Sequence, residues 1–136
     1  MSEVLKPIPS PTDATQAFWS GCSSGVLRLR CCGRCGQFRG PARMVCDCGE
    51  VEFTWKDASG KGQVFSFTVM HRAPDPAFRP DLPYVVAIVA LDEGPHLLAN
   101  LVGCAPDAVS IGMPVKAQFE TVGESIGVVR FTPGSN

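Results

Sequence analysis

The sequence predicts a mainly β protein in which a short helix and a small cysteine-rich module precede a compact β-barrel. Four cysteines in one short window indicate the module, and five β-prone runs in the C-terminal part indicate the barrel. The chain has 136 residues, of which 45% are hydrophobic, enough to bury one core. We expect an arm and helix over residues 1–25, the cysteine module over 26–56 and the barrel over 57–136.

The N-terminal segment is expected to be extended and then helical. Residues 6–11 contain three prolines, which a helix interior does not tolerate. Thr12 or Asp13 is then positioned to cap a short helix that ends by Gly25. The aromatic pair Phe18 and Trp19 requires burial, either by packing under the cysteine module or by docking on a partner.

The cysteine module has the spacing of a rubredoxin-like zinc ribbon. Two close pairs are separated by ten residues, and the four candidate ligands are Cys32, Cys35, Cys46 and Cys48. A hairpin between the pairs can bring four thiolates to one tetrahedral metal ion. Gly36 and Gly49 follow the pairs, where a thiolate turn needs a residue at positive φ. The expected cofactor is structural Zn²⁺.

The second pair departs from the usual spacing. Cys46 and Cys48 enclose one residue where an ordinary knuckle has two, so we expect a distorted turn, with Cys31 as a substitute ligand. An iron site of the rubredoxin kind would use the same ligands, and a disulfide framework or a set of free thiols would also account for the cysteines. Disulfides suit secreted proteins, whereas this N-terminus lacks the features of a signal peptide. The expected location is therefore the cytoplasm, with no membrane association.

The charges are unevenly distributed although the formal net charge is only −1. Five arginines and no acidic residue lie between Ser23 and Cys46. They are Arg28, Arg30, Arg34, Arg39 and Arg43. One interpretation is compensation of the negative charge of a tetrathiolate centre. The other is a basic face for the phosphates of a nucleic acid or of coenzyme A.

The rest of the chain reads as strands. An alternating edge strand is expected over 26–30, and a further strand over 51–56 completes the metal module. After a turn at 60–62, the barrel strands are expected at 64–70, 84–91, 96–102, 115–121 and 126–131. The apolar run 84–91 is typical of a strand covered on both faces. A proline-rich loop spans 71–83, and a short crossover spans 105–113. An OB-fold barrel and an SH3-like barrel both fit this pattern.

Several motifs in combination resemble one family. They are Pro9-x-Pro11-x-Asp13 before Phe18-Trp19-x-Gly21, the cysteine module, Gly62-x-Val64-Phe65-Ser66-Phe67-Thr68-Val69-x-His71-Arg72, Pro83-Tyr84-Val85-Val86-Ala87, Leu98-Ala99-Asn100-Leu101-Val102-Gly103-Cys104 and Ile111-Gly112-Met113-Pro114-Val115. The chain resembles, from about Pro7 to Pro133, the zinc-ribbon/OB-fold acyl-CoA-associated family, formerly a domain of unknown function.

The resemblance implies an OB-fold barrel and an accessory role. Members of that family are similar to partners of thiolase-fold enzymes, among them thiolases, acyltransferases and the aldolases that shorten steroid side chains. The barrel is then expected to help form an acyl-CoA site shared with the partner. The ligand set carries over directly at Cys32, Cys35 and Cys46, and with a changed spacing at Cys48.

The residues offer no catalytic set of their own. The chain has two histidines and no nucleophile elbow, phosphate-binding loop or HExxH motif, so activity in isolation is not expected. His71, Arg72 and Phe78 in the proline-rich loop are the candidates for facing a cofactor or partner. Single-stranded nucleic-acid binding is the second candidate function, and the presence of only six basic residues from Lys56 onwards speaks against it.

Overall fold

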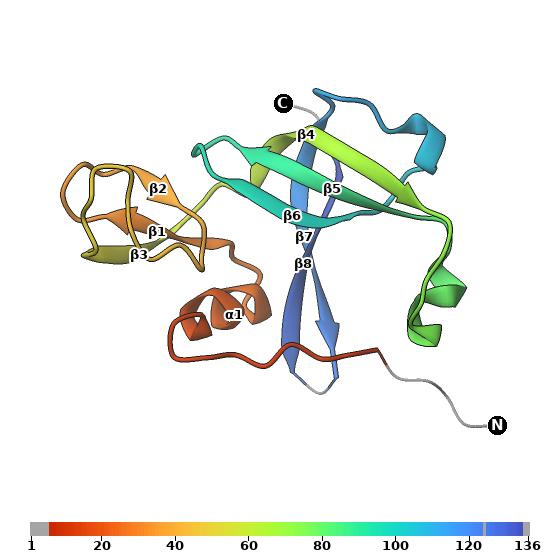
Figure 1. Cartoon of the computed structure of the whole chain (residues 1–136), viewed down its shortest axis with the longest axis horizontal. Helices are drawn as coiled ribbons and strands as arrows, with labels where there is room; N and C mark the ends of the chain where they lie inside the picture. The colour runs from red at the N-terminus through yellow and green to blue at the C-terminus, as the bar shows by residue number, and fades with distance from the viewer. Residues whose placement is uncertain (1–5, 124, 135–136) are drawn as a thin grey trace.

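The computed structural model describes residues 6–123 and 125–134. A three-stranded sheet and a closed five-stranded barrel lie side by side, with one short α-helix below the sheet and against the lower part of the barrel (Figure 1). The predicted fold class, mainly β with a short N-terminal helix, is confirmed. Within the described residues, no helix has the length and apolar composition that a membrane crossing requires.

Helix α1 (Gln16–Ser23) begins later than predicted. Thr15 takes the N-cap position, and its hydroxyl accepts the backbone N–H of Thr12 at 3.1 Å, so residues 12–15 form a turn before the helix. Phe18 is buried in the barrel core, and Trp19 packs edge-on against it with ring centroids 5.1 Å apart. The aromatic pair is thus packed within the chain, against the barrel.

The small sheet contains β1 (Arg28–Cys32), β2 (Phe38–Arg39) and β3 (Phe53–Asp57) in the order β2-β1-β3. The expectation of an edge strand at 26–30 is wrong, because β1 pairs antiparallel with both neighbours. Four consecutive residues of β1, from Leu29 to Cys32, are buried. Alternation of apolar and basic residues misled the prediction, since the basic residue Arg30 is buried as well.

The barrel contains β4 (Lys61–Met70), β5 (Tyr84–Leu91), β6 (His96–Leu101), β7 (Pro114–Val122) and β8 (Ile126–Pro133). The strand order β4-β5-β6-β8-β7 returns to β4, and β6 and β8 are the one parallel pair among the described strands. This Greek-key order is that of the expected OB-fold barrel. Closure leaves the apolar strands without long free edges.

Three local expectations are corrected. Lys61 and Gly62 belong to β4, so the predicted turn at 60–62 is confined to Gly60, whose φ is 76°. The loop 71–83 contains a 3₁₀ helix, η1 (Pro76–Asp81), and the crossover contains a second, η2 (Pro106–Ala108). Strand β5 alternates buried and half-buried residues, so only one of its faces lies in the core.

One hydrophobic core joins the barrel, the helix and the start of the ribbon. Phe131 and Val89 of the barrel and Leu29 of β1 are all fully buried in it. Gly127 of β8 permits this arrangement, because a Cβ there would lie 2.5 Å from the backbone oxygen of Cys22 in α1. The proposed domain boundaries at residues 25 and 56 remain predictions.

Candidate functional site

The four predicted ligand cysteines lie together at one end of the ribbon. All four Sγ atoms lie within 4.8 Å of one another. Cys32 Sγ is 3.6 Å from Cys48 Sγ, and Cys35 Sγ is 3.6 Å from Cys46 Sγ. With metal–sulfur bonds of about 2.3 Å, a tetrahedral centre has sulfur–sulfur distances of about 3.8 Å. These four cysteines could therefore hold a metal ion.

The two knuckles differ in their backbone contacts. Gly36 and Gly49 have φ of 76° and 90°, the positive values that the turns require. In the first knuckle the N–H groups of Arg34 and Cys35 point at Cys32 Sγ, at 3.4 and 3.5 Å. The described hydrogen bonds include no backbone N–H to Cys46 Sγ, which instead contacts the side-chain oxygen of Gln37 at 3.7 Å.

The thiols oppose one another's ionisation. Backbone N–H groups, first that of Cys35 and then that of Arg34, lower the pKa of Cys32 to about 6. The N–H of Gln37 acts in the same sense on Cys35, but neighbouring thiols, first that of Cys46, together with burial raise the pKa of Cys35 to about 12. A metal cation would remove this conflict by stabilising all four thiolates. The donor set fits a tetrathiolate metal centre.

Cys31 is not brought into the cluster. It lies on β1 next to Cys32, and successive side chains of a strand point to opposite faces. Its thiol instead contacts the carbonyl oxygen of Gly36 at 3.3 Å. The structure gives no support to Cys31 as a substitute ligand.

The arginines do not form a basic face. Arg30 and Arg39 are buried, and Arg28 and Arg43 form ion pairs with Asp57 and Asp47. Of the five, Arg34 alone is exposed without an ion pair among the described residues. The expectation of a phosphate-binding face on the ribbon is therefore wrong in the free chain. That removes the main attraction for a nucleic acid.

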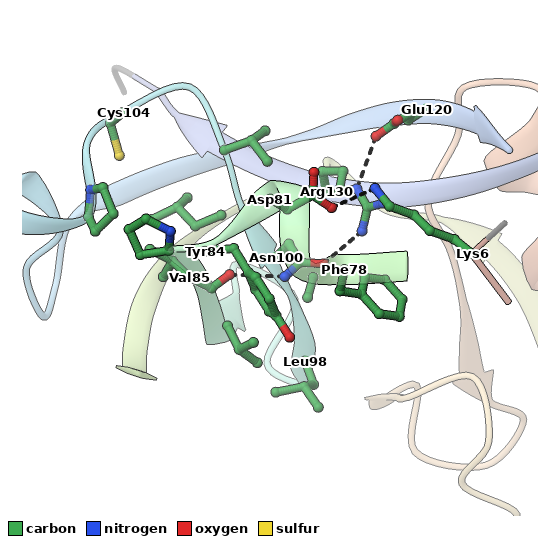
Figure 2. Close-up of a pocket in the computed structure, with 16 residues that line it drawn as sticks. Lys6, Phe78, Asp81, Tyr84, Val85, Leu98, Asn100, Cys104, Glu120 and Arg130 are labelled. Carbon is green, nitrogen blue, oxygen red and sulfur yellow. Dashed lines mark hydrogen bonds and ion pairs between the residues drawn. The ribbon is translucent and has the colours of Figure 1, made fainter. Parts of the chain in front are cut away.

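A second site is an open cavity of about 630 Å³ on the outer face of β5 and β6 (Figure 2). Tyr84, Val86 and Leu98 give it an apolar wall. Phe78 on η1 lines it, with its ring 6.4 Å from that of Tyr84. His71 and Arg72 are exposed and are not among its lining residues, so the three loop candidates do not share one site.

A polar network crosses the cavity. Arg130 donates to the Asn100 side-chain oxygen at 2.7 Å and to Glu120 at 3.1 Å. Asn100 in turn donates to the carbonyl oxygen of Val85 at 3.1 Å, so the network links β5, β6, β7 and β8 (Figure 2). At the border, Lys6 of the N-terminal arm pairs with Asp81 of η1 at 2.6 Å.

Sequence reasoning missed these cavity residues. Asn100 and Arg130 are at outward positions of their strands, which alternation alone could have shown. Their meeting depends on β6 lying beside β8, a pairing between strands that are not consecutive in the chain. No local signal predicts that contact.

The fold and the two sites define an OB-fold protein with a cysteine ribbon. Comparison with known proteins then identifies its family. Residues 55–120 match the family model described as "ChsH2, C-terminal OB-fold domain". A DUF35 domain-containing scaffold protein of Methanocaldococcus jannaschii is 40% identical over 95 residues, covering 68% of this chain and 67% of that protein. The chain belongs to the DUF35 family.

Two further proteins are similar over most of this chain. A probable enoyl-CoA hydratase alpha subunit of Thermomonospora curvata is 42% identical over 115 residues, covering 83% of this chain. The chain spans only 35% of that subunit's length. A solved structure, the "Ltp2-ChsH2(DUF35) aldolase", contains a chain that matches with a TM-score of 0.82 and 35% identity. That match covers 93% of this chain and 98% of the other.

Proposed function

We propose that the chain is a non-catalytic accessory subunit that binds a thiolase-fold enzyme and helps form its acyl-CoA site. The observation that carries this proposal is the nearly full-length similarity to a chain of the Ltp2-ChsH2(DUF35) aldolase, a protein whose name joins two components. The relative from Thermomonospora curvata is named a probable enoyl-CoA hydratase alpha subunit. The word subunit supports the accessory role, and the CoA ester in the name supports the acyl-CoA site.

The cavity on the barrel is the proposed contribution to the acyl-CoA site. One wall of the cavity is apolar, as an acyl chain requires, and the polar network beside it is internally paired. Phe78 lies in this wall, while His71 and Arg72 lie on the exposed part of the same loop, where a partner could contact them. In this proposal the barrel acts on the acyl-CoA channel and the ribbon supports the assembly, in the cytoplasm.

We further propose that the ribbon holds structural Zn²⁺ on Cys32, Cys35, Cys46 and Cys48. The sulfur geometry fits, and zinc favours a closed tetrathiolate site. A zinc protein is colourless, whereas a ferric tetrathiolate absorbs visible light. Metal analysis by plasma mass spectrometry combined with an absorption spectrum therefore separates zinc from iron.

The test of the accessory role is purification of the tagged chain from its native source at gentle salt, with identification of companions by mass spectrometry. We expect a thiolase-fold protein in a fixed ratio, and turnover of an acyl-CoA only when both proteins are present. Turnover by the isolated chain, or a monodisperse chain without a companion, contradicts the proposal.

The loop residues provide a second test on the assembled enzyme. Phe78→Ala and Arg72→Ala should lower the activity of the complex several-fold while leaving the melting temperature of the free chain nearly unchanged. Arg34→Ala, at an exposed arginine of the ribbon, serves as the control. Equal loss of activity and stability would show that the loop is merely structural.

A further inference from the structure

Two arginine side chains lie buried side by side in the ribbon. Arg30 is 1% exposed and Arg39 is 2% exposed, and the two residues are direct cross-strand partners on β1 and β2. Like charges in this position are unfavourable even at a protein surface, and burial increases the cost. Because arginine stays protonated in proteins, the pair brings two positive charges into the interior.

Among the residues that the structure describes, the pair has no carboxylate partner. The ion pairs of the described residues join other cations to acidic groups, and none includes Arg30 or Arg39. Arg30 donates to the carbonyl oxygens of Pro41 at 2.8 Å and Ala14 at 2.6 Å. Its guanidinium carbon lies 4.2 Å from the centroid of the Phe53 ring. Carbonyl dipoles and aromatic faces solvate the charge but do not neutralise it.

Arg39 is less completely satisfied. It donates to the carbonyl oxygens of Arg43 at 2.9 Å and Val51 at 3.0 Å, while its buried Nη1 has no hydrogen-bond partner. A buried charged nitrogen without a partner is costly. We therefore expect a nearby negative charge other than a carboxylate to stabilise the Arg39 guanidinium.

The four-cysteine cluster lies next to the pair. Cys32 and Arg30 are two residues apart on β1, so their side chains share one face of the sheet. Cys32 is the cross-strand partner of Phe53, the residue whose ring faces both guanidinium groups. The carbonyls that hold Arg39 belong to the segment 43–51, which also carries Cys46 and Cys48.

We propose that the Arg30–Arg39 pair is the buried countercharge of the metal centre. Four thiolates around one Zn²⁺ carry a formal charge of about −2, which two guanidinium groups balance. The pair then strengthens metal binding from outside the ligand shell. Conversely, metal loss leaves two uncompensated cations in the ribbon interior, so the segment 43–51 should open.

The same contacts connect the metal centre to the N-terminal helix. Arg30 bonds the carbonyl of Ala14, directly before the N-cap residue Thr15 of α1. If the negative charge of the metal centre holds Arg30 in place, metal removal should loosen the start of α1 while the barrel strands stay protected. The amides of Thr15 and Trp19 donate to the carbonyls of Thr12 and Thr15 at the start of α1. Their hydrogen exchange, with and without a chelator, measures this connection without any enzyme activity.

The decisive experiment compares charge with hydrogen bonding at Arg39. Zinc affinity is measured at pH 7 by competition with a chromogenic chelator, for the wild type, Arg39→Gln and Arg39→Lys. The Gln variant loses the charge and the Lys variant keeps it, while both lose the forked contacts to the carbonyls. We expect the Gln variant to bind zinc at least about tenfold more weakly, and the Lys variant to stay within about threefold of the wild type.

The control is Arg43→Gln, because Arg43 lies on the same segment but is exposed and paired with Asp47. Its zinc affinity should be unchanged, since exposed ion pairs contribute little. Hydrogen exchange of the barrel strands verifies that every variant is folded. Equal affinities of the Gln and Lys variants would overturn the countercharge, as would exchange at Thr15 and Trp19 that is the same with and without the chelator. The inference rests on the proposed zinc centre, and a wild type that binds no zinc would overturn both.

Discussion

The barrel and the ribbon are stabilised by different physical means. In the barrel, the fully buried side chains are apolar, with Phe131 and Val89 at the centre. In the ribbon, the largest fully buried side chains are Arg30 and Arg39. A core of this kind gains little from the hydrophobic effect and depends on electrostatic partners. We therefore expect the barrel to hold its fold by itself and the ribbon to depend on the proposed metal ion.

The largest expected effect comes from removing one ligand. Cys35→Ala should abolish zinc binding and unfold the ribbon segment 33–52, because the binding energy of a structural metal is folding energy for so small a module. The barrel should keep its hydrogen-exchange protection. Cys104→Ala, at a thiol outside the cluster, is the control. Unchanged metal content in the Cys35 variant would contradict the ligand assignment.

A second variant tests how much the apolar core stabilises the barrel. Phe131→Ala removes a fully buried ring and should lower the free energy of unfolding by about 3–5 kcal/mol. Chemical denaturation followed by circular dichroism measures this change. The same substitution at Phe65, which is 55% exposed, should change it by less than about 1 kcal/mol. If metal removal from the wild type lowered barrel stability as much as Phe131→Ala, the two regions would not be independent.

The barrel and the ribbon also differ in how much of their structure the sequence could predict. Cysteine spacing and glycine positions are local signals, so the four-cysteine cluster was predictable residue by residue. Runs of β-prone residues likewise predicted the barrel strands. The burial of Arg30 and Arg39 was not predictable, because β1 looked like an exposed edge strand until its two antiparallel partners were known. The cavity network also depends on a non-local contact, the parallel pairing of β6 with β8.

A third prediction concerns the contact between α1 and the barrel. Gly127→Ala places a Cβ against the backbone of Cys22, which cannot move without displacing α1 from β8. We expect a loss of about 2 kcal/mol in unfolding free energy, as for other overpacked contacts. Gly40→Ala is the matched control, since a Cβ there meets no atom within 4 Å. A Gly127 variant as stable as the Gly40 variant would show that α1 is only loosely attached to the barrel.

The smallest effect is a pH dependence at the same junction. Burial raises the pKa of Cys22 from 9.0 to about 11, because the thiolate form would be desolvated. A raised pKa in the folded state stabilises the protein below pH 9, where the thiol is protonated in both states. This contribution decreases as the pH rises towards 11, since the unfolded chain ionises first.

At pH 10 the loss should amount to about 1 kcal/mol. Other groups also titrate in this range, so the measurement is the difference between the wild type and Cys22→Ala in denaturation curves at pH 7 and pH 10. The Ala variant should be less stable at pH 7 because a cavity is left, yet its further loss on going to pH 10 should be smaller than that of the wild type. An identical pH response in both proteins would mean that water reaches Cys22 in the folded state, and that the contact between α1 and the barrel does not exclude solvent.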